Sequence, residues 1–389
     1  MTGSTRPVAP VAPVLFLLFV TGWAANHFAA LLPVLQREEG LSPGLLAGVY
    51  GLYAVGLLPG LLLGGGLSDR IGRKVLAVPG AAVALLGTVS LLVWHDPAGL
   101  IVGRLLVGLG AGATFSAGTA WATDRRGTTG ATWAGVALTA GFAGGPVVSG
   151  VLAQVSAHPL PVTFGLSALL SAVAVVGAAR LRPVGTGRTA TPPTVAPGAS
   201  APRRVRSTSA ALGWALPIAP WVFAGATVGV VTLPSRLDES LRGPLLTGIS
   251  AGVVLGTGIV VQVLARRVGA GPGAGVLGAA AAAAGLVLAG VGGAAPALAL
   301  VLAAAVLLGI GYGLCLRAGL LDLATWAPPD SRGSLTGLFY LCTYIGFGVP
   351  VLLEAVRPTL GPELPLLVLG GLSVLAAFQR GLRLARSRG

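Results

Sequence analysis

Long apolar runs, separated by short polar or charged breaks, dominate the hydrophobic pattern of this chain. A helix needs about 20 apolar residues to cross a membrane. Windows of that length predict twelve membrane-spanning helices near residues 12–34, 44–66, 75–95, 98–121, 131–154, 161–181, 210–233, 244–265, 272–292, 295–317, 333–355 and 361–380. We therefore expect an all-α membrane protein.

A segment of different composition separates the first six predicted helices from the last six. Residues 182–209 are rich in Pro, Thr, Ser, Ala and Arg without apolar periodicity, which is typical of a solvated linker. The sequence thus predicts an N-terminal six-helix bundle over 1–181, a cytoplasmic linker over 182–209 and a C-terminal six-helix bundle over 210–389. Gly346-Phe347-Gly348-Val349-Pro350 in the eleventh helix weakly repeats Gly144-Gly145-Pro146 in the fifth, which suggests pseudo-symmetric halves.

Composition supports this class and fixes an orientation. The chain is 54% hydrophobic with a mean hydropathy of +0.88, too apolar for a water-soluble domain. Its net charge of +14 comes from arginines that gather in alternate loops, as expected when basic residues stay in the cytoplasm. The opposite loops hold only Arg37, Arg236, Arg242 and Arg357. We therefore expect both termini in the cytoplasm, and the basic charge does not require a nucleic-acid partner.

The first apolar run has an alternative interpretation as a cleaved signal peptide. Small residues at Ala24 and Ala25 follow the run from Val14 to Val20, as at a cleavage site. The apolar stretch continues to Leu35, however, which is longer than the hydrophobic region of most signal peptides. We favour a retained membrane helix.

The most informative polar break lies between the second and third predicted helices. It reads Gly65-Gly66-Leu67-Ser68-Asp69-Arg70-Ile71-Gly72-Arg73-Lys74 and is predicted to be a short cytoplasmic hairpin, because charged side chains are costly inside the bilayer. Seven residues of this segment match the signature loop of a transporter family, and they are Gly65, Leu67, Asp69, Arg70, Gly72, Arg73 and Lys74. In this segment the chain resembles the major facilitator superfamily of transporters. The motif of the fifth predicted helix, described below, adds a resemblance to the branch of drug or metabolite exporters that exchange protons.

This resemblance implies a fold, a function and a set of partners. The fold would be two pseudo-symmetric six-helix bundles that rock around a central site, carrying a small-molecule substrate across the plasma (inner) membrane by alternating access. A monomer in the lipid bilayer is implied, with protons as possible co-substrates. We expect no catalytic residues, metal or cofactor, since the sequence has neither an ATP-binding loop nor a cluster of acid, base or metal-ligand side chains.

Two predicted helices carry polar residues for a substrate or proton pathway. Arg104, with Gly108 and Gly110, resembles the family's arginine motif in the fourth helix. A charged side chain is unfavourable in lipid, so we expect Arg104 to face a cavity rather than to extend to the membrane interface. Asn26 and His27 lie at a comparable depth in the first helix. His27 can relay protons near neutral pH, or it can be a structural histidine bonded to a backbone carbonyl.

The fifth predicted helix contains a pattern of small residues and proline. Gly141, Gly145, Pro146 and Gly150 resemble the family motif associated with exporters, although Ser149 replaces a family glycine. Small residues four apart let two helices approach closely, and proline removes a backbone hydrogen bond. We expect this helix to take part in the conformational change.

By resemblance, the signature segment forms a conformational gate with the end of the fourth helix. Asp124 would pair with Arg70 or Arg73, while Asp69 would meet the start of the eleventh helix near Gly333 and Ser334. The alternative is that these charges only fix the orientation of the chain in the membrane. For basic residues outside this segment we favour the alternative.

Aromatic residues are candidates for the wall of the central cavity. By family resemblance the first, fourth, seventh and tenth helices surround it, which favours Trp23, Trp221 and Tyr312 among the aromatic residues of the chain. An aromatic pocket with one cation and no anion would suit a neutral or anionic amphipathic solute better than a cation.

No acidic residue lies in the middle of a predicted helix, where many proton-driven exporters of this family carry a carboxylate. If protons are coupled, His27 is the main candidate carrier, with Asp322 or Glu354 as weaker ones. Proton-coupled export is the leading interpretation, and an importer or facilitator without proton coupling is the alternative. A receptor or scaffold would not need both the signature segment and a buried arginine.

Overall fold

The computed structural model describes residues 10–181 and 206–387, and every regular element in this part of the chain is helical. The first group of helices comprises α1 (Ala12–Asn26), the 3₁₀ segment η1 (His27–Leu31), α2 (Leu32–Glu38), α3 (Pro43–Ile71), α4 (Arg73–Val93), α5 (Pro97–Val155) and α6 (Pro159–Ala179). The second group comprises α7 (Thr208–Ala215), η2 (Leu216–Ile218), α8 (Ala219–Thr227), the π-helical segment η3 (Val228–Thr232), α9 (Leu233–Ser235), α10 (Pro244–Arg267), α11 (Ala274–Val291), α12 (Leu298–Trp326), η4 (Pro329–Ser331), α13 (Arg332–Tyr344), the 3₁₀ segment η5 (Ile345–Gly348), α14 (Val349–Leu360) and α15 (Leu364–Arg386).

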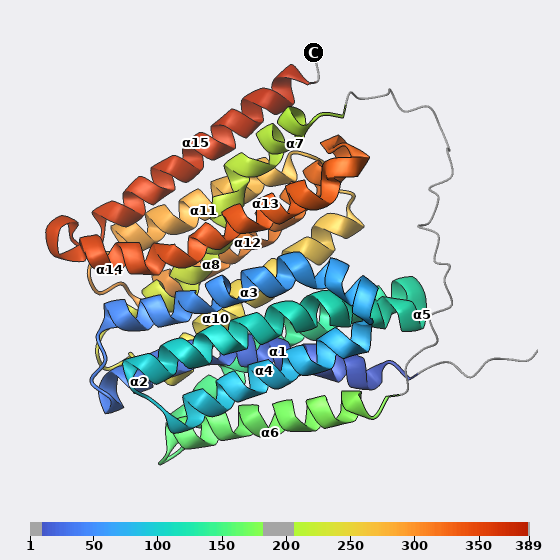
Figure 1. The fold of residues 1–389 in the computed structure, drawn as a ribbon. Coiled ribbons are helices and arrows are strands. Elements are labelled where there is room, and N and C mark those ends of the chain that lie inside the picture. The colour runs from blue at the N-terminus through green and yellow to red at the C-terminus, as the bar shows by residue number, and fades with distance from the viewer. Residues whose placement is uncertain (1–9, 182–205, 388–389) are drawn as a thin grey trace, which may run out of the picture.

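The two groups lie beside each other in Figure 1, with the first group below and most of the second above, while α10 of the second group packs against α5 of the first. Each has its own large cluster of buried hydrophobic side chains, and the first cluster also includes Val230, Ala251 and Phe347 from the second group. Residues 182–205, most of the predicted linker, lie outside the described residues. The division of the chain at 181 and 210 therefore stays a prediction.

Eleven helical stretches in the described part are long and apolar enough to cross a membrane. One of them, α5, has 59 residues, about three times the length that spans the hydrocarbon core. Gly127 interrupts it with non-helical angles (φ 59°, ψ −140°). The predicted fourth and fifth helices are thus the two arms of α5, and the count of twelve is reached only when α5 is divided at Gly127.

The signature segment is helical, so the prediction of a hairpin loop over 65–74 was wrong in extent. α3 continues to Ile71 and α4 begins at Arg73, which leaves Gly72 as the single turn residue. Its φ of 105° lies in a region that side chains with a Cβ rarely adopt, which explains the glycine. Both Gly65 and Asp69 therefore lie within the last turns of α3.

Three membrane stretches lose α-helical geometry before a proline. These irregular segments are η1, η3 and η5, and the prolines that follow are Pro33, Pro234 and Pro350. Proline has no backbone N–H, so the carbonyl four residues earlier loses its helical hydrogen-bond donor and the local winding changes. All three stretches border the cavities described next.

Candidate functional site

A cavity of about 720 Å³ lies between the two groups of helices. Its polar residues include Asn26, Ser116, Thr119, Thr123 and Thr139. Aromatic residues are the largest group in its wall, and they are Tyr50, Tyr53, Phe115, Phe142, Phe223, Tyr312, Tyr340, Tyr344 and Phe347. We call this space the inner cavity, because it reaches Arg73 and Asp124 at the end of the molecule that is predicted to face the cytoplasm.

Arg73 and Asp124 are the charged residues that line the inner cavity, and they bind each other. Arg73 Nε lies 3.2 Å from Asp124 Oδ2, and its Nη1 donates a hydrogen bond of 2.6 Å to Ser68 Oγ. Arg73 also forms an ion pair with Asp69. Of the predicted gate residues, the structure thus brings together Asp69, Arg73 and Asp124.

Of the two predicted partners of Asp124, Arg70 and Arg73, the structure has Arg73. Arg70 is exposed, and no ion pair joins it to Asp124 within the described ranges. Asp69 contacts Arg73 rather than the start of the eleventh predicted helix. A separate cavity of about 400 Å³ lies between Leu62 on α3 and residues Gly333, Ser334, Gly337, Leu338 and Leu341 at the start of α13.

Phe347 closes the inner cavity at its other end. Its ring centroid lies 5.0 Å from that of Phe223, 5.7 Å from Tyr344, 5.9 Å from Tyr50 and 6.4 Å from Tyr53. Tyr50 and Tyr53 belong to α3, whereas the other three rings come from the second group of helices. We call these five residues the aromatic septum, since they join the two groups across the middle of the molecule.

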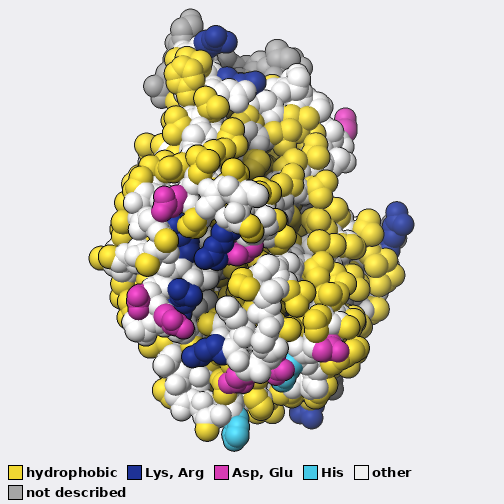
Figure 2. All heavy atoms as spheres, turned by 90° about the vertical axis from the view of Figure 1, so that its left-hand side faces the viewer, with side chains coloured by type: hydrophobic (Ala, Val, Ile, Leu, Met, Phe, Trp, Pro, Cys, Tyr) yellow, Lys and Arg dark blue, Asp and Glu magenta, His cyan; other side chains and the backbone are white. Residues whose placement is uncertain are grey.

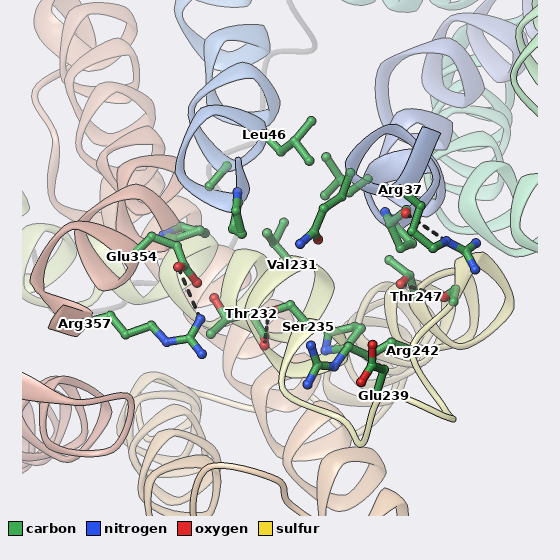
Figure 3. Close-up of a pocket in the computed structure, with 18 residues that line it drawn as sticks. Arg37, Leu46, Val231, Thr232, Ser235, Glu239, Arg242, Thr247, Glu354 and Arg357 are labelled. Carbon is green, nitrogen blue, oxygen red and sulfur yellow. Dashed lines mark hydrogen bonds and ion pairs between the residues drawn. The ribbon is translucent and has the colours of Figure 1, made fainter. Parts of the chain in front are cut away.

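A second cavity, the outer vestibule, occupies about 510 Å³ beyond the septum. Its lining includes Ala47, Val231 and Pro350. Each of these lies within one helical turn of a residue that lines the inner cavity, so only a short length of helix separates the two spaces. Figure 3 shows that charged side chains surround it, and they are Arg37, Glu239, Arg242, Glu354 and Arg357. Acidic and basic side chains are also prominent on this end of the molecule in Figure 2.

Arg104 is fully buried, so the snorkelling alternative was wrong. Its guanidinium donates hydrogen bonds to the backbone carbonyls of Ala25 (2.9 Å), Tyr50 (3.1 Å) and Val49 (3.4 Å). Its Cζ also lies 4.7 Å from the centroid of the Phe28 ring. Arg104 is not among the lining residues of the inner cavity, so it ties α5 to α1 and α3 behind the cavity wall.

The neighbours Asn26 and His27 face different surroundings. Asn26 lines the inner cavity, donates to Phe142 O (3.0 Å) and accepts from the Tyr50 hydroxyl (3.3 Å). His27 is fully buried, with Nδ1 3.1 Å from Ala24 O and its ring edge-on to Phe164 of α6. Its Nε2 is buried without a hydrogen-bond partner. Asn26 is thus placed to contact a solute, and His27 lies behind it.

Only one of the three favoured aromatic residues lines the inner cavity. Tyr312 does, and it packs on Phe223 with 5.9 Å between ring centroids. Trp23 and Trp221 are buried elsewhere and do not appear in the cavity wall. The four helices implied by family resemblance do contribute to the wall, but so do α3, the second arm of α5, α10 and α13, and the resemblance did not indicate which face of each helix lines the cavity.

The small residues of the predicted fifth helix hold the second arm of α5 against two other helices. A Cβ on Gly141 would overlap the carbonyl oxygen of Phe19 in α1, and one on Gly145 would lie 3.1 Å from Trp23 O. Gly150 meets α10, where a Cβ would lie 2.5 Å from Pro244 O. The carbonyl of Pro146 lies against Gly248 of α10. The motif therefore packs closely against α1 through Gly141 and Gly145, and against α10 of the second group through Pro146 and Gly150.

The sequence analysis missed several residues of functional interest. Phe115, Phe142, Phe223 and Phe347 line the inner cavity, but phenylalanine in an apolar helix carries no signal that separates a cavity wall from packing. Phe347 is the exception, because its glycine neighbours and Pro350 had already singled out that stretch of the eleventh helix.

A buried ion pair was also missed. Asp322 of α12 is 5% exposed and Arg380 of α15 is 1% exposed, and 2.7 Å separates Asp322 Oδ2 from Arg380 Nη1. Arg380 also donates to Trp214 O (2.6 Å) and Pro272 O (3.3 Å). Asp322 does not line either large cavity, so the pair fastens helices of the second group together.

Comparison with known proteins adds relatives and a fold. Two relatives are named "Multidrug resistance protein MdtL". The one from Escherichia coli O45:K1 (strain S88 / ExPEC) is 33% identical over 84 residues, 22% of each chain. The one from Klebsiella pneumoniae (strain 342) is 29% identical over 101 residues, 26% of this chain and 25% of the relative. The matched region thus spans about a quarter of each relative.

Solved transporter structures share the whole fold at low sequence identity. A peptide transporter POT in complex with sulfate has a TM-score of 0.79 and 16% identity, over 97% of this chain and 94% of that one. The nucleoside transporter NupG has a TM-score of 0.70 and 15% identity, over 96% and 98%. The family model described as "Major Facilitator Superfamily" matches residues 14–351. The chain therefore belongs to the Major Facilitator Superfamily, as a multi-pass membrane transporter and not an enzyme.

Proposed function

We propose that this transporter exports a small amphipathic solute from the cytoplasm by alternating access. The observation that carries the proposal is the pair of cavities on opposite sides of the aromatic septum. The larger, aromatic one opens toward the end predicted to be cytoplasmic. In this conformation a cavity lies between Leu62 of α3 and Gly333 and Ser334 at the start of α13, although Leu62 approaches Gly337, and we take this as a gate that is not closed. A solute would enter the inner cavity and leave through the outer vestibule.

The wall of the inner cavity favours an uncharged solute. Tyr50 donates its hydroxyl to Asn26, and no hydrogen bond joins the hydroxyls of Tyr53, Tyr312, Tyr340 or Tyr344 to another described residue. The expected preference for anions loses its basis, because the Arg104 charge is committed to backbone carbonyls behind the wall. Phenol groups beside apolar rings suit a neutral solute that carries hydrogen-bond acceptors.

Three observations support export. Relatives matched over about a quarter of their length carry the name "Multidrug resistance protein", and α5 contains the small-residue pattern associated with exporters. The cavities also differ in a way that favours outward release. An amphipathic solute gains free energy by burying apolar surface against the aromatic wall, whereas the charged vestibule offers it less apolar contact.

For coupling we propose proton exchange through His27, whose buried Nε2 has no hydrogen-bond partner. A second candidate is a facilitator without proton coupling. The position of His27 behind the cavity wall favours this second candidate. The carboxylate that lines the inner cavity belongs to Asp124, which is already paired with Arg73 and so is not free to carry a proton.

The test uses proteoliposomes with an imposed proton gradient and a panel of neutral, anionic and cationic amphiphiles. We expect a neutral solute to collapse the gradient with wild-type protein, and the His27→Gln variant to move the solute without proton flux. His158→Gln is the matched control, because His158 is exposed in an outer loop. Solute movement without proton flux in the wild type would establish the facilitator instead. Cations as the best substrates would contradict the neutral class.

A further inference from the structure

A seam of buried polar atoms lies in the first group of helices, behind the wall of the inner cavity. Four of these atoms have no hydrogen-bond partner among the described residues, and they are His27 Nε2, His95 Nε2, Thr163 Oγ1 and Ser167 Oγ. Buried polar groups are almost always hydrogen-bonded, and ordered water is their partner where no protein group is. We call these four residues the polar seam, and their free atoms indicate a site for water.

The ring of Phe164 on α6 brings the two histidines of the polar seam together. Its centroid lies 5.5 Å from that of His27, which approaches edge-on, and 6.2 Å from that of His95, which is stacked on it. Both imidazoles are thus neighbours of the same phenyl ring, and no more than that ring separates them. In Figure 1, α6 runs along the edge of the first group, on the side away from the second group.

The hydroxyl of Ser167 lies at the level of His27. Phe164 meets His27, and Ser171, two turns further along α6, lines a small gap together with Ala24 of α1. Ser167 lies between Phe164 and Ser171 on the same face of the helix, because residues three and four apart are neighbours. The fully buried Ser167 side chain therefore faces α1 between Ala24 and His27.

The polar seam reaches the end of the molecule that is predicted to face outward at His95. His95 Nδ1 lies 3.3 Å from Glu39 Oε1, and the side chain of Glu39 is 35% exposed. Asp96, the acid next to His95, is engaged elsewhere, because its Oδ1 accepts a hydrogen bond of 2.7 Å from the backbone N of Gly99. Glu39 is thus the acid that connects His95 with the outer solvent.

His27 is the inner end of the polar seam. Its Nδ1 lies 3.1 Å from Ala24 O and 3.2 Å from Trp23 O. A carbonyl oxygen only accepts, so Nδ1 carries a hydrogen and Nε2 of the neutral imidazole is the atom that can take up a proton. The charge of Arg104 acts on His27, but its guanidinium is bound to backbone carbonyls. Asn26, next in the chain, lines the inner cavity.

We propose that water fills the polar seam and carries protons from the outer solvent to His27, along a path separate from that of the solute. The inference rests on the proposed proton exchange through His27 and adds the route by which the proton arrives. Glu39 takes a proton from the solvent and passes it to His95 Nδ1, and His95 releases a proton from Nε2. Each water molecule then gains one proton and passes one on, until His27 Nε2 accepts it.

Radiolytic footprinting of the purified full-length protein tests for this water without transport. Hydroxyl radicals formed from bound water hydroxylate a buried phenylalanine that lies beside it. Phe164 and Phe339 are both 0% exposed, and Phe339 packs in the apolar core of the second group. We expect Phe164 to react several times faster than Phe339, and the double variant Thr163→Val/Ser167→Ala to lose most of that difference. Equal rates for the two rings in the wild type would overturn the proposal.

Proton flux and solute counterflow in proteoliposomes separate the proton path from the solute path, because counterflow exchanges two pools of solute without net proton movement. A positioned acid or base typically contributes about 100-fold or more to a proton transfer, so His95→Gln should slow solute-driven proton flux at least about tenfold. Counterflow should keep its wild-type rate. Glu39→Gln should act in the same direction, and provides the test if His95→Gln folds poorly. His158→Gln, exposed at the start of α6, is the control and should change neither rate.

The outcomes distinguish the proton path from the proposed exporter. An equal loss of proton flux and counterflow in His95→Gln would make His95 a structural residue and refute the path. Wild-type proton flux in both His95→Gln and Glu39→Gln would refute it as well. If wild-type protein moved solute without protons while Phe164 still reacted faster than Phe339, the proposed exchange through His27 would fail and the path with it, although the water site itself would be established.

Discussion

Two buried arginines in this protein are stabilised in different ways. Arg104 has no carboxylate partner among the residues that the structure describes, and its three hydrogen bonds go to backbone carbonyls. Arg380 is paired with Asp322 and also binds two carbonyls. A backbone carbonyl is present whatever the side chain, so the partners of Arg104 could not be found from sequence patterns. The Asp322–Arg380 pair joins residues that each seemed to lie at the end of a span.

The Asp322–Arg380 pair gives a prediction about stability. Asp322→Asn removes the negative charge and leaves Arg380 buried without its counter-charge, which typically costs about 3–5 kcal/mol. We expect a large fall in the melting temperature of the purified protein. The double variant Asp322→Leu/Arg380→Met removes both charges and should recover much of the loss.

Thermal unfolding in detergent, followed by tryptophan fluorescence, measures this effect. Asp330→Asn is the control, because Asp330 lies in the exposed turn after α12. If Asp322→Asn melted at the wild-type temperature, the pair would not fasten α12 to α15.

At the scale of elements, helix positions were predictable and helix breaks were only partly so. Hydropathy located the spans, because membrane helices must be long and apolar. It placed loops where the charges are, but Asp69 and Arg70 lie inside a helix that extends beyond the membrane core and turns at Gly72 alone. The 3₁₀ and π segments depend on prolines whose effect varies with the packing around them.

The second arm of α5 gives a prediction about packing. Gly141→Ala places a methyl group against the backbone of α1, and overpacking of this kind costs about 1–3 kcal/mol. Gly144→Ala is the matched control three residues along the same helix, where a Cβ would have no neighbour within 4 Å. We expect a lower melting temperature and slower solute transport for Gly141→Ala alone, and equal behaviour of the two variants would contradict the role of the motif in packing.

At the scale of the whole molecule, the sequence predicted a central site between two helix groups but not which residues face it. Hydropathy is the same for an aromatic ring in a cavity wall and one packed between helices, so Trp23 and Tyr312 could not be distinguished. The faces of the helices follow from long-range packing, which local patterns do not contain.

The conformation gives a prediction about access from the two sides of the membrane. Thr119 lines the inner cavity and Ser235 the outer vestibule. In a Cys342→Ser background, a membrane-impermeant maleimide should label Ser235→Cys in intact cells and Thr119→Cys in inside-out vesicles. If the opposite conformation is populated at about 0.1–10%, each cysteine can also be labelled from the other side of the membrane. That labelling should be at least about tenfold slower than labelling from the expected side. The reverse pattern would overturn the predicted orientation.

The aromatic septum has an electrical consequence. With one cavity open toward each side of the membrane, the insulating layer between the two aqueous compartments is reduced to these five side chains and the helices around them. The membrane voltage then falls mainly across that thin layer, where each 100 mV acts on a unit charge with about 2.3 kcal/mol. A neutral solute crosses such a layer without electrical work. Phe347 and its neighbours therefore also form the apolar barrier that prevents ions from leaking across the membrane through the transporter.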